Sequence, residues 1–342
     1  MDRPVLTAAA RRLWRDPQTL QLGRDHRAVV LAGVDPGVRA VLAVLDGALS
    51  RSAVLATGQA AGCPPSRTSA LLALLDEAGL LEDASADRAA GLEPAERDQL
   101  AADLAGLSLL GESTRDAVHH RTRAHVLVLG AGRVGTAVAA LLDGAGVGIV
   151  QVHDDGPVRP HHVGVAGPAA RDVGRSRGAA AADRLGGRSA SRATGPPDLV
   201  VLAPAVPSAL EADLAQVPAG LPHLLAEVRD TVGIVGPLVL PGRTACLRCL
   251  DLTRSDRDPG WPALAAQLST PVRGMTACDG VLAVAVAAQA CLQVLALVDG
   301  PSRPASAGGT LELAMPDWRW RRRTWALHPA CGCAPRPGGR AA

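Results

Sequence analysis

Two pairs of closely spaced cysteines are the residues of this sequence whose types and spacing point most directly to chemistry. Cys246 and Cys249 are separated by two residues, whereas Cys331 and Cys333, far along the chain, are separated by one. Two such pairs can supply the four soft thiolate ligands of a tetrahedral structural zinc. A site of this kind is coordinatively closed, so it would contribute folding energy rather than catalysis. His328 is a candidate substitute ligand, and reduced thiols without metal are the alternative.

A glycine-rich turn followed by an acid forms the second constellation. Gly130, Gly132 and Gly135 lie between an apolar run and a helical pattern, and Asp154 follows the next apolar run. Glycines at such a turn let the backbone approach a phosphate, and an acid after the following strand can accept the ribose hydroxyls. The order strand, glycines, helix, strand and acid predicts a Rossmann-like nucleotide fold. A dehydrogenase would carry the same glycines, and a fold kept only for packing is the third interpretation.

The other cysteines and the paired histidines are weaker candidates for chemistry. Cys278 precedes an apolar helical pattern, where a helix N-terminus could activate a thiolate, but a packing role is the simpler interpretation. Cys63 and Cys291 lie in segments that offer no activating charge. The adjacent pairs His119–His120 and His161–His162 cannot share one helix face, which argues against metal binding there.

Two further segments stand out by their apolar or aromatic pattern. Residues 281–298 approach the length of a membrane span, but Gln289 and Gln293 interrupt them and no arginine cluster flanks them. We therefore expect a buried helix and no membrane association. Residues 318–321 alternate Trp and Arg, as a strand with one buried face would. A solvated sheet edge or a contact for an acidic peptide would account for this segment.

Composition and charge indicate a folded protein and argue against nucleic-acid binding. The chain has 342 residues, of which 48% are hydrophobic and 20% charged, enough for two or three packed domains. Its 35 basic residues are all arginines, lie scattered and are balanced by 33 acids, so the basic patch of a nucleic-acid binder is missing. The early Asp2 argues against a secretory signal. The seven cysteines, an odd number, suit a reducing compartment, and we expect a cytoplasmic protein.

The elements that would position these residues fall into consecutive parts. Residues 1–85 combine a hairpin with three short helical patterns, which is the size and order of a winged-helix-like domain. Residues 86–124, where Pro94 opens a helical stretch that runs through Leu107, form a helical connector. Continuous apolar runs of the parallel-sheet kind begin after it, so we expect an α/β nucleotide fold with the zinc site over residues 125–335 and a tail at 336–342. The hairpin is predicted at 19–23 and 28–33, and the helical patterns at 38–45, 51–61 and 66–78.

The second half of the chain resembles the ThiF/MoeB/HesA superfamily of ubiquitin-activating-like adenylyltransferases. The matching motifs lie between residues 120 and 335: the glycine turn through Asp155, residues 172–177, residues 242–249 and Cys278-Asp279-Gly280-Val281. The resemblance implies a ThiF-type fold, ATP and Mg²⁺ as cofactors, adenylation of the C-terminal carboxylate of a small protein, and a homodimer. It also implies that Arg177 occupies the place of the family's phosphate-contacting lysine.

Several positions depart from the pattern of that family. Gly156 stands where a further acid usually follows the ribose aspartate, and residues 159–162 (Arg-Pro-His-His) replace the expected Asn and Arg-Gln. The apolar run 198–202 continues into Ala203-Pro204-Ala205, where active members place the aspartate that holds magnesium. Without that carboxylate the metal lacks its ligand, and the charge that develops on leaving pyrophosphate is less compensated. These departures argue against ATP and Mg²⁺ as working cofactors.

The N-terminal part resembles PqqD-like peptide-recognition domains through its hairpin, Asp46-Gly47 and Ala78-Gly79-Leu80-Leu81. Such domains capture the leader of a ribosomally made peptide by adding it as a strand to the hairpin edge. Fused to a ThiF-like domain, this arrangement is similar to the leader-binding partner of azoline-forming cyclodehydratases, in which a separate YcaO-type protein uses the ATP. We therefore predict a protein with a degenerate adenylation site that binds a precursor leader peptide and presents it to a YcaO-type or similar partner enzyme. The alternative function is that of an active ATP-dependent adenylyltransferase, and a nucleotide-dependent oxidoreductase is a third class of function.

Overall fold

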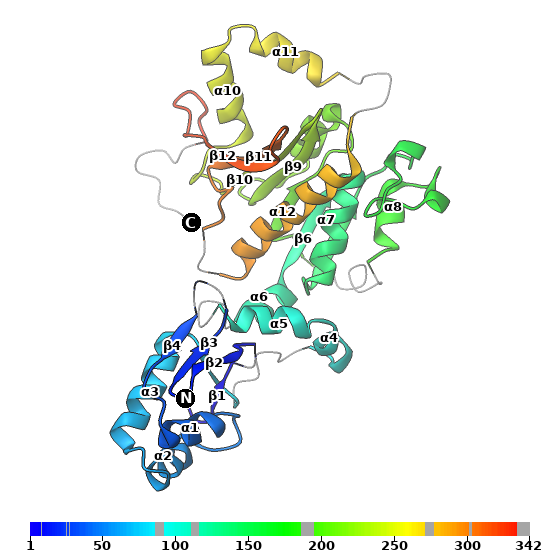
Figure 1. Cartoon of the computed structure of the whole chain (residues 1–342). Coiled ribbons are helices and arrows are strands. Elements are labelled where there is room, and N and C mark those ends of the chain that lie inside the picture. Colours follow the sequence, from blue (N-terminus) through cyan, green and yellow to red (C-terminus); the bar gives the residue numbers. More distant parts are fainter. Residues whose placement is uncertain are drawn as a thin grey trace. The chain divides into compact units, whose positions relative to one another are not determined.

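The chain folds as two compact units, Met1–His120 and Arg121–Ala342, and each is described by itself (Figure 1). The computed structural model describes residues 1–7, 9–24, 26, 28–85, 92–110, 116–185, 195–270, 277–300 and 303–333. The predicted tail at 336–342 and parts of the predicted connector, at 86–91 and 111–115, lie outside the described residues.

Unit 1 contains two small antiparallel sheets. β2 (Arg12–Asp16), β3 (Thr19–Leu22) and β4 (Val29–Leu31) form a meander in that order, and β1 (Pro4–Leu6) pairs with β5 (Leu81–Asp83). The β3–β4 pair, in which Leu20 lies opposite Leu31, confirms the predicted hairpin. The sequence pattern missed β2 because that strand has no buried face from which an apolar alternation could arise.

Three helices follow the meander and close the core of unit 1. α1 (Pro36–Ala43), α2 (Arg51–Ala60) and α3 (Pro65–Glu77) occupy the three predicted helical segments. The Asp35 and Ser50 side chains cap α1 and α2 by accepting hydrogen bonds from backbone N–H groups of the first turn. Cys63 is fully buried and accepts a hydrogen bond from the Thr68 hydroxyl at 3.4 Å, so it has the packing role that the sequence predicts.

The predicted connector is helical but not continuous. α4 (Pro94–Gln99) and α5 (Ala101–Ser108) are separated at Leu100, whose backbone (φ −90°, ψ 5°) leaves the α region, and α6 (Ala117–Arg123) follows. The single helical stretch from Pro94 to Leu107 is therefore wrong in its continuity. Residues Leu92, Leu100, Leu107, Ala117 and Val118 form a small core of their own.

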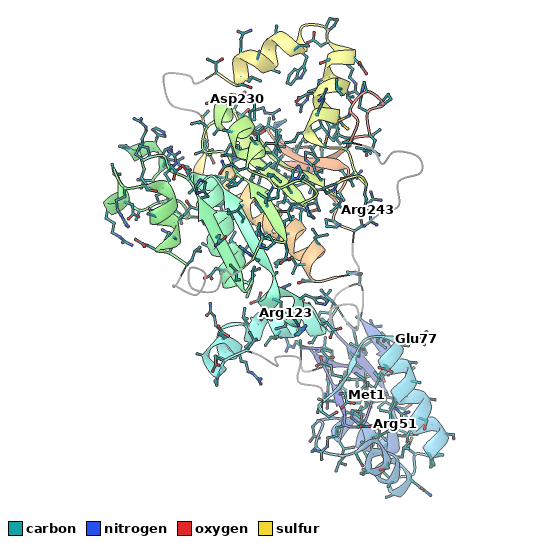
Figure 2. All side chains as sticks on the ribbon, turned by 180° about the vertical axis from the view of Figure 1, so that it is seen from behind. Met1, Arg51, Glu77, Arg123, Asp230 and Arg243 are labelled. Atoms are coloured by element: carbon teal, nitrogen blue, oxygen red, sulfur yellow. The ribbon has the colours of Figure 1, made fainter. Side chains whose placement is uncertain are left out.

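Unit 2 is built on a seven-stranded mixed sheet with the order β12-β11-β10-β9-β8-β6-β7. β7, β6, β8 and β9 run parallel, as the continuous apolar runs predict, and β10, β11 and β12 extend the sheet in antiparallel fashion. β9 turns into β10 at Asp230, which has a φ of 55° (Figure 2). The strands are β6 (His125–Leu129), β7 (Ile149–His153), β8 (Leu199–Leu202), β9 (His223–Arg229), β10 (Val232–Val239), β11 (Gly309–Ala314) and β12 (Arg319–Thr324).

Helices cover both faces of this sheet. α7 (Arg133–Gly144) and α12 (Gly280–Val298) lie side by side on one face, where they build the largest core of the unit (Figure 1). α9 (Leu210–Ala215) packs Leu210 and Leu214 against a second core on strands β6, β8 and β9. The remaining helices are α8 (Arg177–Ala182), α10 (Leu247–Arg257), α11 (Trp261–Leu268) and 3₁₀ turns at Pro160–His162, Ala170–Asp172 and Pro207–Ala209.

Two segments that the sequence singled out differ in part from expectation. α12 is the one helix among the described residues long and apolar enough to cross a membrane, and one of its sides is buried in the core of unit 2. Its other side is not buried as expected: Val281, Val284 and Leu292 are exposed. The buried face predicted for residues 318–321 is wrong, because β12 is the edge strand and all six of its residues are exposed. The alternative of a solvated sheet edge is confirmed.

Candidate functional site

The predicted glycine turn connects β6 to α7 and is held by close backbone packing. Gly130 has a φ of +95°, and a Cβ built there would lie 2.1 Å from the Ala203 carbonyl oxygen. A Cβ on Gly135 would lie 1.9 Å from the Gly130 carbonyl oxygen. A Cβ on Gly132 would lie 3.2 Å from Cα and Cβ of Ala205. Each position therefore admits only glycine or a local shift, and the segment after β8 lies directly against the turn.

Asp154 follows β7 and lies beside the turn, as the predicted strand order requires. One carboxylate oxygen accepts a hydrogen bond from Ala131 N at 2.7 Å, and the other accepts from Gly156 N at 2.9 Å. The side chain is only 8% exposed. Asp154 is thus positioned by the backbone at the edge where an acid could accept ribose hydroxyls.

Arg177, the first residue of α8, forms an ion pair with the Asp154 carboxylate. Its Nε donates to Oδ2 of Asp154 and its Nη2 to Oδ1, both at 2.8 Å, and its Nη1 donates to the Pro157 carbonyl at 3.0 Å. The guanidinium passes directly over Gly156, where a Cβ would lie 2.2 Å from Nη2. The structure therefore places Asp154 and Arg177, the two charged residues predicted to bind a nucleotide, side by side and paired with each other.

The carboxyl end of β8 carries no acidic side chain. Ala203 is 1% exposed and packs against the glycine turn, and Pro204 and Ala205 follow. No carboxylate of this segment can therefore reach a metal ion bound at the turn. This is the position where the resemblance places the magnesium aspartate.

Asp213, in α9, is an acid near this site that sequence reasoning missed. Its Oδ2 is buried and has no hydrogen-bond partner among the described residues. Burial and, secondarily, the negative charge of Asp154 raise the pKa of Asp213 to about 6. The sequence did contain a sign of this residue. Asp213 lies in the α-helix that follows β8, and a helix in that place begins near the carboxyl edge of the sheet.

The histidines next to the site are structural. His162 is 6% exposed, and its Nδ1 accepts a hydrogen bond from Arg159 N at 3.1 Å. Burial, followed by the charge of Arg177, lowers the pKa of His162 to about 4. His161 stacks edge-on against it, with ring centres 4.3 Å apart. Within the described residues this pair joins no metal-type cluster, and the only such cluster is formed by cysteines.

Cys278 and Cys291 have surroundings that disfavour a thiolate. Burial raises the pKa of both thiols, that of Cys291 to about 12. The Cys278 carbonyl accepts a hydrogen bond from Arg133 Nη1 at 2.6 Å, which ties the start of α12 to α7. Packing roles for both residues are consistent with this geometry.

The four predicted cysteines converge in space. The Sγ atoms of Cys246 and Cys249 are 3.8 Å apart, those of Cys246 and Cys331 3.4 Å, and those of Cys249 and Cys333 3.3 Å. All four sulfur atoms lie within 4.8 Å of one another. Sulfur ligands at about 2.3 Å from a tetrahedral zinc lie about 3.8 Å apart, so the cluster can hold one metal ion.

The cluster is supported by neighbouring groups, and His328 is one of them. His328 N donates to Cys249 Sγ at 3.3 Å. Although burial opposes it, this bond and those from the other cysteines lower the pKa of Cys249 to about 7. The His328 ring does not face the sulfurs, because Nε2 lies 2.8 Å from Asp256 Oδ2 and Nδ1 accepts from Ala330 N. The interpretation of His328 as a substitute ligand is therefore wrong.

Solved structures share this architecture, whereas neither a protein-family model nor a curated protein matches the chain. Escherichia coli MccB with ATP superposes with a TM-score of 0.74 at 16% identity, covering 98% of this chain and 100% of that one. MccB, the microcin C7 biosynthetic enzyme, in complex with N-formylated MccA gives 0.73 at 16% identity and the same coverage. PaaA gives 0.68 at 18% identity, covering 93% and 99%. These likenesses show that the chain shares the MccB fold over nearly its whole length, and for residues 125–335 they support the expected ThiF-like fold.

Proposed function

We propose that this chain binds a precursor leader peptide and presents it to a separate modifying enzyme, its own adenylation site being degenerate. The observation that carries the proposal is the pairing of Asp154 with Arg177. A bidentate guanidinium occupies both carboxylate oxygens that a ribose would use. Ala203-Pro204-Ala205 leaves the adjoining strand end without a metal ligand. The nucleotide-binding roles of Gly130, Gly132, Gly135, Asp154 and Arg177 thus become roles in holding the fold.

The fold comparison supports a peptide as the ligand. MccB has been crystallised with N-formylated MccA and, separately, with ATP. We infer that this chain retains binding of a peptide on the same fold. The activating ATP would be used by a YcaO-type or similar partner, in the cytoplasm.

Unit 1 offers the edge to which a peptide strand could add. Within the described residues β2 pairs only with β3, so its other edge is open. Gly23 N donates to Arg11 O at 2.9 Å, and in an antiparallel pair the next residue, Arg12, then directs its N–H away from β3. The exposed side chains of Arg12, Trp14 and Arg15 along this edge suit an acidic leader with an apolar residue.

Two further proposals concern assembly and metal. The exposed residues Val281, Val284 and Leu292 lie along one stripe of α12, and we propose that a second copy of the chain covers this stripe in a homodimer.

We propose structural Zn²⁺ at Cys246, Cys249, Cys331 and Cys333, since tetrahedral thiolate sites suit that ion. Bound there, zinc would tie the segment around Cys333 to the start of α10.

Peptide binding is tested with the full chain and a fluorescein-labelled leader peptide encoded beside its gene, by fluorescence anisotropy. Arg12→Pro removes the backbone N–H that residue 12 directs toward the open edge of β2, whereas Arg12→Ala keeps this N–H. We therefore expect the peptide to bind about tenfold more weakly to the proline variant than to the alanine variant. Thermal melting of both variants controls for folding. Absence of binding by the wild-type chain would refute the proposal.

An active adenylyltransferase is the second candidate, and Asp213 favours it. Its buried, unpartnered Oδ2 near Asp154 supplies a carboxylate that β8 lacks. In that case Asp213→Asn would abolish magnesium-dependent ATP turnover. If the proposed function holds instead, neither the wild-type chain nor the Asp213→Asn variant shows magnesium-dependent ATP turnover.

A further inference from the structure

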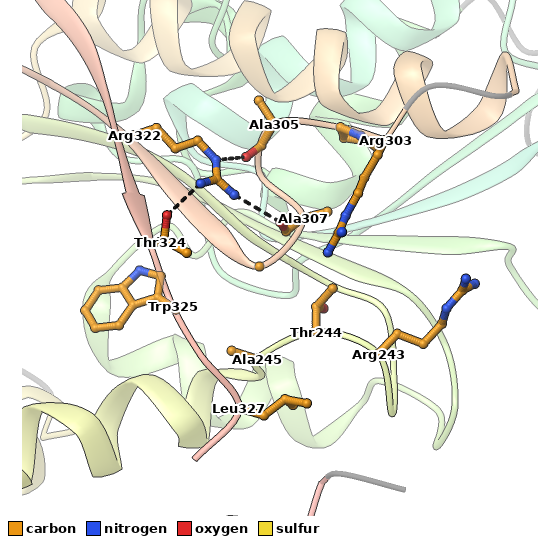
Figure 3. Close-up of a pocket in the computed structure, with 12 residues that line it drawn as sticks. Arg243, Thr244, Ala245, Arg303, Ala305, Ala307, Arg322, Thr324, Trp325 and Leu327 are labelled. Carbon is orange, nitrogen blue, oxygen red and sulfur yellow. Dashed lines mark hydrogen bonds between the residues drawn. The ribbon is translucent and has the colours of Figure 1, made fainter.

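Unit 2 contains a pocket of about 500 Å³ that includes none of the residues assigned above to nucleotide or metal binding (Figure 3). It lies between the segment after β10, the loop before β11 and the end of β12. Three arginines line it, Arg243, Arg303 and Arg322, and none of its described lining residues is acidic. Its volume falls in the range of small-molecule sites, roughly 300 to 1,000 Å³.

Arg322 is fixed in the wall of the pocket by neutral partners. Its Nε donates to the Ala305 carbonyl at 2.7 Å, its Nη1 to Thr324 Oγ1 at 2.7 Å, and its Nη2 to the Ala307 carbonyl at 3.4 Å (Figure 3). These bonds hold the loop before β11 against β12 without neutralising the guanidinium charge. A positive charge is thus built into the wall in a fixed orientation.

Arg243 and Arg303 contribute charge that no described residue balances. Both are exposed, and no hydrogen bond or ion pair engages either guanidinium within the described part of the chain. Figure 3 shows Arg303 extending into the pocket, on the side opposite Arg322. A Cβ built on Gly308 would lie 4.0 Å from Arg303 Nη2, so the guanidinium passes over this glycine. The two arginines are available to a ligand.

The rest of the lining includes a buried tryptophan and apolar side chains. Trp325 is 5% exposed, and its Nε1 donates to Thr310 Oγ1 at 3.1 Å, which fixes the ring. Pro304 and Leu327 add apolar surface. Such a lining can accommodate the organic part of a small ligand beside its charged group.

We propose that this pocket binds a phosphate dianion, either free or as the monoester group of a small metabolite. Arg303 and Arg322 bring positive charge to the pocket, Arg243 adds charge at its margin, and none of the described lining residues is acidic, so a doubly charged anion would be attracted there. The planar guanidinium fork of Arg243 or Arg303 matches two oxygens of a phosphate, while Arg322 supplies a fixed positive charge. Thr324 Oγ1, which already accepts from Arg322, can donate its own proton to a phosphate oxygen.

The test is isothermal titration calorimetry of the full chain with inorganic phosphate and, separately, with glycerol phosphate, at constant ionic strength. Arg243→Gln/Arg303→Gln is the test variant, because neither side chain holds a described element in place. Arg257→Gln, which removes an exposed arginine outside the pocket, is the matched control. We expect the double variant to raise the dissociation constant at least about tenfold and the control to leave it unchanged.

The two ligands distinguish the source of the anion. Equal binding of both identifies the phosphate group alone as the recognised element, and tighter binding of the ester identifies a metabolite. The proposal is overturned if the wild-type chain binds neither ligand. It is also overturned if the double variant binds both as tightly as wild type, because the anion then binds elsewhere.

Discussion

The Arg177 guanidinium donates two hydrogen bonds of 2.8 Å to the Asp154 carboxylate and lies directly over Gly156. The identities of residues 177 and 156 are therefore coupled in this structure, because a Cβ at position 156 would collide with the guanidinium. Only a residue without a Cβ leaves room for the guanidinium, and only arginine fills both carboxylate oxygens.

This coupling predicts that Gly156→Ala displaces Arg177 from Asp154. Asp154 and Arg177 are 8% and 13% exposed, so we expect a loss of about 1 to 3 kcal/mol in the free energy of unfolding. In a chain that already carries Arg177→Lys, Gly156→Ala should cost less free energy of unfolding, because the guanidinium with which the new Cβ would collide is gone. Urea unfolding of both single variants and the double variant measures the coupling. Additive effects would show that the two positions are independent.

Arg177→Lys alone should open the ribose position. Lysine makes a single-point contact and leaves one oxygen of Asp154 available to a hydroxyl. We expect ATP to bind at least about tenfold more tightly to this variant than to wild type, measured by calorimetry. Arg175→Lys, at a nearby exposed arginine that pairs with Asp172 and Asp183, is the control and should change nothing.

The four-cysteine cluster predicts one zinc per chain. Cys249→Ser should remove the metal, measured by plasma mass spectrometry, and lower the Tm of unit 2 by about 10 °C. His328→Ala should retain it, because the ring bonds to Asp256 rather than to the sulfurs. Cys278→Ser, outside the cluster, is a further control. Zinc loss in the His328 variant would contradict this ligand set.

Asp213 predicts an unusual dependence of stability on pH. Its pKa rises from 3.8 in the unfolded chain to about 6 in the fold, so between these values the folded state binds a proton that the unfolded state releases. Stability contributed by this group therefore falls as pH increases from about 4 to 6. Asp213→Asn should stabilise the protein by roughly 1 to 2 kcal/mol at pH 8 and by nothing below pH 4, in urea unfolding. An equal gain at both pH values would argue against this origin.

Local patterns predicted the elements and the cysteine site, whereas side-chain pairing escaped them. The order of strand, glycines and acid placed Gly130 and Asp154 together because parallel strands end at one edge of a sheet. The two cysteine pairs converge as their spacing predicts for a cluster that can hold a metal ion. The Arg177–Asp154 pair depends on which rotamer the arginine adopts, and the burial of the Asp213 carboxylate depends on where α9 packs. A short sequence motif encodes neither property. The strand β2 was missed, and a buried face was wrongly predicted for the segment that forms β12, because edge strands need no buried face.

The central claim is tested most directly by exchange of labelled pyrophosphate into ATP. The full chain, zinc-loaded, would be assayed with Mg²⁺ and the leader peptide that it binds in the anisotropy experiment. The paired Asp154 and the acid-free end of β8 predict no exchange above the level without protein. Magnesium- and peptide-dependent exchange by the wild-type chain would contradict the account and identify the site as a working adenylyltransferase.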